Sequence, residues 1–306
     1  MKLIEIPLEE YEKTFTMEPH PFISIKYLKI NAHKTDALIC LVPSDKKFKM
    51  GLISGISEKV LKSPFSAPFG GFHFNNNRIY YSYINNFIKA LKQYIIRNYQ
   101  GIDLLMPPDF YHYSINTKCI HSMICADFTL GIPEINNWID LHYYNGNYPD
   151  PQVKRNLIKS NNILSFSLIP DINDKEKCFE IIVDNRKRLN RSIYMDFNDI
   201  LEMAKIVPID FFGVTEKKSM VASAVIYRIN NNIVKIIFWG DSDYGRTVHA
   251  MDFLIDKLWI YYMKEGFTII DVGTSTDMGI PNDGLIRFKE NHGCYSSPQF
   301  YLKWRK

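Results

Sequence analysis

The sequence predicts a mixed α/β protein built from two domains that share one order of helices and strands. Its 306 residues are about twice the usual length of a single domain. In each half, apolar patterns predict helices, a meander of strands, a glycine-containing turn, a long helix and a further strand. We therefore expect a duplicated α/β fold, with domains at 1–145 and 146–306 joined near the Gly/Pro/Asn-rich stretch 145–151.

The first half is predicted to place one long helix on a sheet. Apolar residues recur every four positions from Ile79 to Ile95, the stripe of a helix packed on strands. We expect Asn75 to Asn77 to cap this helix, and Pro68-Phe69-Gly70-Gly71 to form a turn with unusual backbone angles. The helices are expected at 7–16 and 78–99. The strands are expected at 37–42, 48–54, 60–65 and 102–106, with an extended region at 122–141.

The second half shows the predicted order most clearly. A short apolar strand runs into Gly240 to Thr247, which opens a long amphipathic helix. Backbone N–H groups at such a strand, turn and helix start can receive a phosphate or an oxyanion. The helices are expected at 152–160, 174–189, 196–205 and 246–265. The strands are expected at 163–168, 211–215, 220–227, 233–239 and 267–274, with a closing strand at 295–304.

Composition argues against several classes of protein. The net charge of +4 is too small to indicate a nucleic-acid binder with a dense basic stripe. The chain turns acidic too early for a signal peptide and has no apolar run long enough to span a membrane. Its five cysteines are widely spaced and never form C-x-x-C. We therefore expect reduced thiols in a cytoplasmic protein and no metal site, since no His/Asp/Glu cluster has ligand spacing.

Several segments carry a resemblance to a known family. They are Phe238-Trp239-Gly240, the helix with His249 to Leu254, the strand Ile270 to Ser275, the run Asn282 to Glu290 followed by Gly293, and Pro68 to Gly71. Together they resemble the GNAT acyltransferase superfamily, and most closely its Fem-type branch, in which two such domains lie in one chain. The resemblance implies two mixed, mostly antiparallel sheets flanked by helices. It also implies a donor site in the second domain, where the sheet opens at a bulged strand.

The resemblance also implies an N-acyltransferase that moves an acyl or aminoacyl group to an amine of a small molecule, sugar or peptide, in cell-envelope or polysaccharide metabolism. The carbonyl end of the acyl donor would contact Phe238, Trp239 and Gly240. The phosphates of the donor would contact Gly245, Arg246 and Thr247. Fem-type enzymes place a Phe-Lys pair beside the reacting centre, matched here by Phe288 and Lys289. The residues expected to contact the acceptor are Phe69, Gly70, Gly71, Thr274 and Asn282.

The donor loop departs from the family pattern. The usual acetyl-CoA loop has a second small residue after Gly245, and here Asp241 and Asp243 would repel a pyrophosphate. The donor is therefore either an acyl-CoA or an aminoacyl-tRNA, as in Fem-type enzymes. The alternative from another class is a catalytically degenerate protein that binds a nucleotide-linked sugar or a protein partner. An α/β hydrolase is not indicated, because the sequence contains no G-x-S-x-G elbow.

Each candidate residue also has a purely structural reading. Lys289 either stabilises the oxyanion of an acyl-transfer intermediate or is a solvated lysine on a helix surface. Asp271 either accepts a proton from the incoming amine or caps the turn at 273–275. Gly70 and Gly71 either shape an acceptor cleft or only permit a turn. Basic residues on two predicted helices either bind a phosphate-bearing acceptor or tRNA, or form solvated helix faces. They are Lys154, Arg155, Arg186, Lys187, Arg188 and Arg191.

Overall fold

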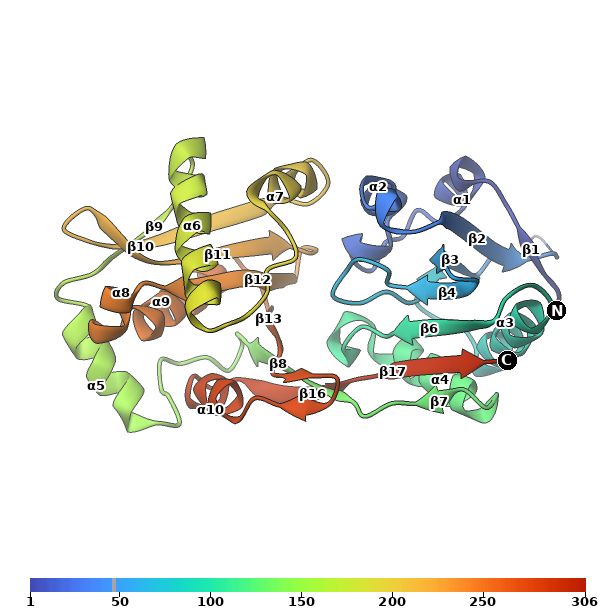
Figure 1. Cartoon of the computed structure of the whole chain (residues 1–306). Helices are drawn as coiled ribbons and strands as arrows, with labels where there is room; N and C mark the ends of the chain where they lie inside the picture. Colours follow the sequence, from blue (N-terminus) through green and yellow to red (C-terminus); the bar gives the residue numbers. More distant parts are fainter. Residues whose placement is uncertain (46–47) are drawn as a thin grey trace. The chain divides into compact units, whose positions relative to one another are not determined.

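A computed structural model of the chain describes residues 1–45 and 48–306, and these form two compact units, coloured by sequence in Figure 1. The first unit comprises Met1–Ile135, Asp277–Ile280 and Ser297–Lys306. The second unit comprises Asn136–Thr276 and Pro281–Ser296. Each unit carries its own sheet and its own apolar core. Among the described residues, no helix has both the length and the apolar character needed to cross a bilayer.

The units divide the chain differently from the predicted boundary at 145/146. The change of unit falls between Ile135 and Asn136, because strand β8 (Glu134–Asp140) pairs with a strand of the second sheet. The predicted closing strand at 295–304 is two strands, β16 (Tyr295–Gln299) and β17 (Tyr301–Arg305). β17 pairs with strands of the first sheet, so the end of the chain returns to the first unit.

The sheet of the first unit is mostly antiparallel. Its strands, in spatial order, are β1 (Leu3–Glu5), β2 (Ala37–Pro43), β3 (Met50–Ser57), β4 (Val60–Ser63), β6 (Gly101–Leu105), β17 and β7 (Thr129–Leu130), and β5 (His73–Phe74) pairs with β3. The helices of this unit are α1 (Leu8–Thr14), α2 (Ile25–Ile30), α3 (Tyr81–Asn98) and α4 (Tyr113–Cys125). The apolar stripe of α3 is buried in the core as its spacing predicts, from Ile84 to Ile95.

Two predictions for the first unit are wrong. Tyr80 is the N-cap residue of α3 and makes no side-chain cap bond, so Asn75 to Asn77 do not cap this helix. The region predicted to be extended from 122 includes the end of helix α4, which packs against α3 and buries Ile115, Cys119 and Met123. Tertiary burial of this apolar face therefore overrides the extended reading.

The sheet of the second unit has helices on both faces. Its strands, in spatial order, are β16, β8, β13 (Ile269–Thr274), β12 (Ile233–Asp241), β11 (Ser219–Arg228), β10 (Ile209–Glu216) and β9 (Ser165–Leu168). The helices are α5 (Pro151–Ser160), α6 (Ile172–Arg188), α7 (Phe197–Ala204), α8 (Asp243–Thr247), α9 (Ala250–Lys264) and α10 (Asp283–Asn291). In Figure 1, α6 crosses β11 and β12. Ser223 of β11 donates to the Cys178 carbonyl of α6, whereas Ala224 lies in the core with α9.

The predicted long helix at 246–265 is interrupted. His249 has a left-handed backbone (φ 59°) and separates α8 from α9, which begins at Ala250. A left-handed residue cannot continue an α-helix, so the chain changes direction here. A small two-stranded ladder, β14 (Thr276–Asp277) with β15 (Ile280–Pro281), lies between β13 and α10 in the sequence. The predicted fold class is confirmed: the parallel pairs β4·β6 and β12·β13 are set in mostly antiparallel sheets.

Candidate functional site

The parallel strands β12 and β13 are paired over only part of their length. Their register joins Ile233 to Ile269, Val234 to Ile270 and Lys235 to Asp271, and no further pair follows. Beyond Lys235, strand β12 continues to Asp241 and pairs only with β11, with a bulge at Ile237. One edge of β12 therefore has no strand partner from residue 236 onwards, within the part of the chain that the structure describes.

A glycine turns β13 away from β12. Gly273 has a left-handed backbone (φ 81°), and the register of β13 with β8 shifts between Asp271 and Gly273. Such a residue forms a bulge that bends a strand, and glycine adopts this conformation without a steric penalty. Strand β13 then continues with β8, where Thr274 lies opposite Asn136. The bulges in β12 and β13 together produce the opening of the sheet.

Lys289 extends from α10 to the end of β13. Its Nζ donates hydrogen bonds to the carbonyl oxygens of Gly273 (2.8 Å) and Thr274 (3.0 Å). Lys289 is 2% exposed, so the reading as a solvated surface lysine is wrong. Burial, assisted by the charges of Lys235 and Arg186, lowers the pKa of Lys289 to about 7. Near neutral pH its amine therefore exists in both the protonated and the neutral form.

A buried ion pair lies at the point where the strands part. Lys235 Nζ is 2.7 Å from Asp271 Oδ2, and both side chains are buried. The other carboxylate oxygen accepts hydrogen bonds from the Gly273 N–H (2.9 Å) and from Asn136 Nδ2 (3.1 Å). Asp271 thus caps the turn at Gly273, as its structural reading predicts. Lys235 was missed by sequence reasoning, although a charge inside the apolar run of 233–236 was the available signal.

Aromatic side chains fill the space next to Lys289. The Phe288 ring lies edge-to-face with Trp239 of β12, with ring centroids 6.1 Å apart. Phe238 faces the opposite side of the sheet and contacts Phe179 of α6. Both Phe288 and Trp239 are half-buried and pack on the core of the second unit. The structure thus brings Trp239, Phe288 and Lys289 together, and Phe238 to Gly240 form part of the unpaired edge of β12.

Arg188 neutralises the two acidic residues of the expected donor loop, Asp241 and Asp243. Arg188 of α6 bonds Asp241 Oδ1 (2.7 Å) and Asp243 Oδ1 (2.9 Å). Asn185 also donates to Asp241 Oδ1 (2.8 Å). Burial raises the pKa of Asp241 despite this arginine. The repulsion that Asp241 and Asp243 would exert on a pyrophosphate is therefore reduced.

The rest of the donor loop is ordered by close backbone packing. Gly245 lies against the Val221 carbonyl oxygen, which would be only 2.2 Å from an added Cβ. Its N–H donates to Ser242 Oγ (3.0 Å). Arg246 and Thr247 are exposed, and Thr247 Oγ1 donates to the Tyr244 carbonyl oxygen. Gly245 therefore has a packing reason of its own, separate from any ligand.

The residues expected to contact the acceptor fall in both units. Thr274 is exposed, and its carbonyl oxygen accepts from Lys289. Asn282 is the N-cap residue of α10, where its Oδ1 accepts from the Leu285 N–H (3.1 Å). The remaining three, Phe69, Gly70 and Gly71, belong to the first unit.

In the first unit these residues form a closed turn. Phe69 is 1% exposed and packs edge-to-face with Phe22. The Gly70 N–H donates to the Leu105 carbonyl oxygen (2.9 Å), and Gly71 has φ 116° with its N–H on Ser63 Oγ. These contacts agree with the reading that the glycines permit a turn.

Arg186 differs from the other cations at the end of α6. Lys187 lies 3.9 Å from Asp184, and Arg188 binds two carboxylates. Arg186 is half-buried, and in the described ranges 1–45 and 48–306 no carboxylate forms an ion pair with it. Burial and the neighbouring Arg191 lower the pKa of Arg186. Within α6, Arg186 thus differs from Lys187 and Arg188, which both lie near carboxylates.

No group of three or more His, Cys, Asp or Glu side chains has the geometry of a metal site in the described part of the chain. The pair of His292 and Cys294 is also no nucleophile–base pair. The His292 ring contacts Asp252 and the Phe288 carbonyl instead, and burial raises the pKa of Cys294 to about 12. Asp252 therefore pairs with His292, which lies 40 residues away in the sequence.

Comparison with known proteins defines the fold. No family model matches the sequence, and a search of curated proteins finds no match either. The crystal structure of FemX is similar, with a TM-score of 0.69 at 11% identity, over 100% of this chain and 98% of that chain. The C-terminal domain of a putative lysylphosphatidylglycerol synthetase from Agrobacterium fabrum is also similar, with a TM-score of 0.61 at 11% identity. The match covers 98% of this chain and 93% of that chain.

A third solved structure extends the likeness. The tandem GNAT protein from the clavulanic acid biosynthesis pathway has a TM-score of 0.54 at 8% identity, over 99% of this chain and 98% of that chain. Identities this low establish the fold alone. The chain therefore has the tandem GNAT-like, Fem-type fold, as the sequence predicts.

Proposed function

We propose that the protein is an N-acyltransferase that moves an acyl or aminoacyl group from a thioester or ester donor to an amine. The observation that carries this proposal is the Lys289 amine, buried against two carbonyl oxygens where β12 and β13 part. The fold shared with FemX and with a tandem GNAT protein supports the same class of reaction.

In the proposed reaction, the donor carbonyl lies along the unpaired edge of β12, from Phe238 to Gly240. The acceptor amine attacks the carbonyl carbon, so that a C–N bond forms and the carbonyl oxygen becomes an oxyanion. Main-chain N–H groups and Lys289 stabilise this oxyanion, usually the largest contribution to catalysis in acyl transfer. The C–S or C–O bond to the carrier then breaks, and the proton of the amine passes to the leaving carrier or to water.

The protonated form of Lys289 is the form that stabilises the oxyanion. An ammonium group has three N–H donors, and two of them bond the Gly273 and Thr274 carbonyl oxygens. The third remains for the oxyanion. A neutral amine has two N–H donors, both already used in this arrangement. Deprotonation, which occurs at about pH 7 because of burial, therefore removes the catalytic donor.

Asp271 serves this site by positioning rather than by accepting a proton. Both of its oxygens already have donors, from Lys235 on one side and from Gly273 and Asn136 on the other. The turn that it caps carries the two carbonyl oxygens that bind Lys289. We therefore favour the capping role for Asp271, with Phe288 packing beneath the reacting group.

The donor is proposed to approach over the loop of Gly245, Arg246 and Thr247. Arg188 neutralises the carboxylates that would repel donor phosphates, and Arg246 is exposed beside them. Both an acyl-CoA and an aminoacyl-tRNA carry phosphates that fit this chemistry. Aminoacyl transfer of the Fem type is the first alternative, since FemX gives a higher TM-score than the tandem GNAT protein.

The acceptor is proposed to be an amine that also carries an anionic group, on a small molecule, a sugar or a peptide of cell-envelope or polysaccharide metabolism. Arg186 motivates this choice. It lacks a carboxylate partner among the described residues, and its charge acts on Lys289. Thr274 and Asn282 are the further candidates on the acceptor side. An arginine of this kind pairs readily with carboxylate or phosphate groups.

The decisive experiment measures transfer from labelled donors to amine acceptors. Purified protein is incubated with labelled acetyl-CoA or aminoacyl-tRNA and a panel of aminosugars and peptides, and N-acylated product is quantified by mass spectrometry. We expect Lys289→Ala to lower kcat by about 100- to 1000-fold, as when one oxyanion donor is lost. The control Lys257→Ala, on α9, should leave turnover unchanged.

The pH profile separates the cationic role from that of a base. Turnover should fall as pH rises above about 7, tenfold per unit, as Lys289 loses its proton. Lys289→Arg keeps the charge at every pH and should lose this descending limb. Turnover by Lys289→Ala equal to the parent would refute the assignment. Binding of donor without any transfer would favour the degenerate binding protein instead.

A further inference from the structure

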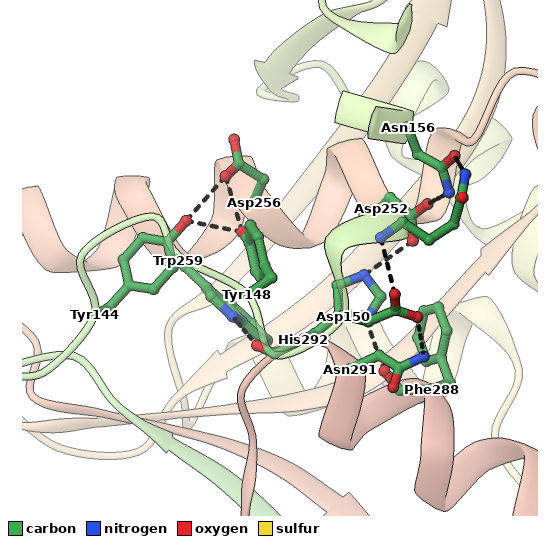
Figure 2. A network of polar contacts seen from close by, with 11 residues as sticks. Tyr144, Tyr148, Asp150, Asn156, Asp252, Asp256, Trp259, Phe288, Asn291 and His292 are labelled. Carbon is green, nitrogen blue, oxygen red and sulfur yellow. Dashed lines mark hydrogen bonds and ion pairs between the residues drawn. The ribbon is translucent and has the colours of Figure 1, made fainter. Parts of the chain in front are cut away.

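His292 lies in a buried polar network at the C-terminal end of α10 (Figure 2). Its Nε2 is 2.9 Å from Asp252 Oδ1, and its Nδ1 is 2.6 Å from the Phe288 carbonyl oxygen. Both partners are acceptors, so the ring donates to both only as an imidazolium. His292 is 2% exposed. When the ring is protonated, Asp252 is its counterion and the contact is an ion pair.

The network fixes this ion pair from two other helices. Asp252 lies on α9, and its second oxygen accepts from Asn156 Nδ2 of α5 at 2.6 Å. The Trp259 indole, also on α9, donates to the His292 carbonyl oxygen at 3.3 Å. Asn291 donates to Asp150 Oδ2, at the start of α5, at 3.0 Å. Figure 2 shows these side chains converging on the last turn of α10.

That same turn contains Lys289. The N–H groups of His292 and Cys294 both donate to the Lys289 carbonyl oxygen at 3.1 Å. The Phe288 ring packs on the His292 ring, with centroids 4.5 Å apart, and also contacts Trp239. Because a lysine side chain is long and flexible, the position of its amine depends on how firmly its backbone and neighbours are held.

We propose that the hydrogen-bonded pair of His292 and Asp252 is a second positioning element of this site, beside Asp271. The pair holds the last turn of α10 so that the Lys289 amine stays against the Gly273 and Thr274 carbonyl oxygens. His292 does not touch the reacting groups; it acts through Phe288 and Lys289. The inference rests on the proposed function for the catalytic meaning of Lys289, but the position of the amine is measurable without any substrate.

The test follows the ionisation of Lys289 in the full-length protein by NMR. Lysine is isotopically labelled, the Lys289 signal is assigned by its loss in Lys289→Arg, and the chemical shift is followed against pH. The parent should titrate at about 7. In Asp252→Asn and His292→Gln the amine becomes more hydrated, so its midpoint should rise by about one unit or more.

The matched control is His142→Gln. His142 forms a like pair with Asp140 at 3.0 Å, but its side chain is exposed, so the Lys289 midpoint should not move. Circular dichroism melts ensure that each variant is folded at the temperature of the titration. A variant that does not fold is replaced by Asn156→Ala, which loosens Asp252 without removing a charge.

The possible results separate positioning from general stability. A raised Lys289 midpoint in the network variants but not in His142→Gln supports the proposal. An unchanged midpoint in folded network variants, even with lowered melting temperatures, overturns it, because the pair then contributes stability alone. Lack of transfer by the parent with every donor would count against the proposed function, and the titration would still decide the positioning role.

Discussion

The two units contain the same parallel strand pair, closed in one and open in the other. In the first unit β4 pairs with β6 from Val60 to Ser63, along the whole of β4. In the second unit β12 pairs with β13 only as far as Lys235 and then continues alone to Asp241. The same parallel arrangement of two strands therefore gives a closed sheet when one strand is paired along its whole length, and an open sheet when the pairing stops early.

The matched positions make the comparison sharp. A lysine lies opposite an aspartate at the third pair of both ladders: Lys62 with Asp103 in the first unit, and Lys235 with Asp271 in the second. In the second unit the two are buried and bonded to each other. In the first unit Asp103 instead binds Arg305 of β17, whose side chain is 45% exposed. The buried pair thus lies in the second unit, where its sheet opens.

The segments after the two ladders explain the difference. In the first unit Pro64 comes directly after β4, and the Gly70 N–H bonds the Leu105 carbonyl at the end of β6. The chain itself thus occupies the place next to that strand end. In the second unit β12 runs on past its ladder, and Gly273 turns β13 away. This contrast supports placing the proposed acyl-transfer site in the second unit.

The largest effect that would test the contrast is the pH dependence of stability caused by Lys289. Its pKa falls from 10.5 to about 7 on folding, so between these values the unfolded chain binds more protons and stability rises with pH. Below about pH 7 the buried charge costs about 4–5 kcal/mol. Lys289→Met should therefore stabilise the protein most at low pH, and its advantage should shrink as pH rises towards 10.5.

Denaturant unfolding at a series of pH values measures this difference in free energy. Lys62→Met, at the closed ladder, is the matched control, since Lys62 is half-buried and lies opposite Asp103 as Lys235 lies opposite Asp271. A stability difference between Lys289→Met and the parent that stays constant from about pH 7 to 10.5 would show that Lys289 is not held neutral by burial.

A smaller effect compares the two aspartates. Asp271→Asn leaves the Lys235 charge buried without a carboxylate, which typically costs about 3–5 kcal/mol. Asp103→Asn removes a partner of a half-exposed arginine, worth about 0–1 kcal/mol. Urea unfolding of both variants measures the two costs. Equal costs would mean that the Lys235–Asp271 pair is no more buried in solution than its counterpart.

The smallest effect concerns the turn that closes the first unit. A Cβ at Gly70 would lie 2.3 Å from Ser63 Oγ and 2.5 Å from the Ser63 carbonyl carbon, so the backbone must shift. Gly70→Ala should lower stability by about 1–3 kcal/mol. Gly284→Ala in α10, where the nearest atom is 3.7 Å away, should instead raise it by about 0.5–1 kcal/mol. Thermal melts that show no loss for Gly70→Ala would mean that this turn is looser than its contacts indicate.

Local patterns predicted those elements whose apolar faces repeat along the chain. The stripe of α3 and the apolar runs of β11 and β12 are buried as their spacing requires. The break at His249 and the last turn of α4 were not predicted. The last turn of α4 depends on burial in a core formed by residues distant in sequence. The final strand could not be assigned to the first unit for the same reason: Leu302 is apolar in either sheet, and only pairing with Leu104 decides.

The sequence by itself determined the fold class and the repeated order of strand, turn and long helix in each half, because apolar periodicity and glycine positions are local properties of the chain. The segment with Phe288 and Lys289 was singled out by its resemblance to the Fem-type pattern. Tertiary structure decided the chemistry. Lys289 and Lys235 are charged residues like many others in the sequence. Burial beside main-chain carbonyls gives the first a pKa of about 7, and Asp271, 36 residues away, gives the second its counterion. Electrostatic energy depends on distance and burial, and both are fixed only when remote segments pack together.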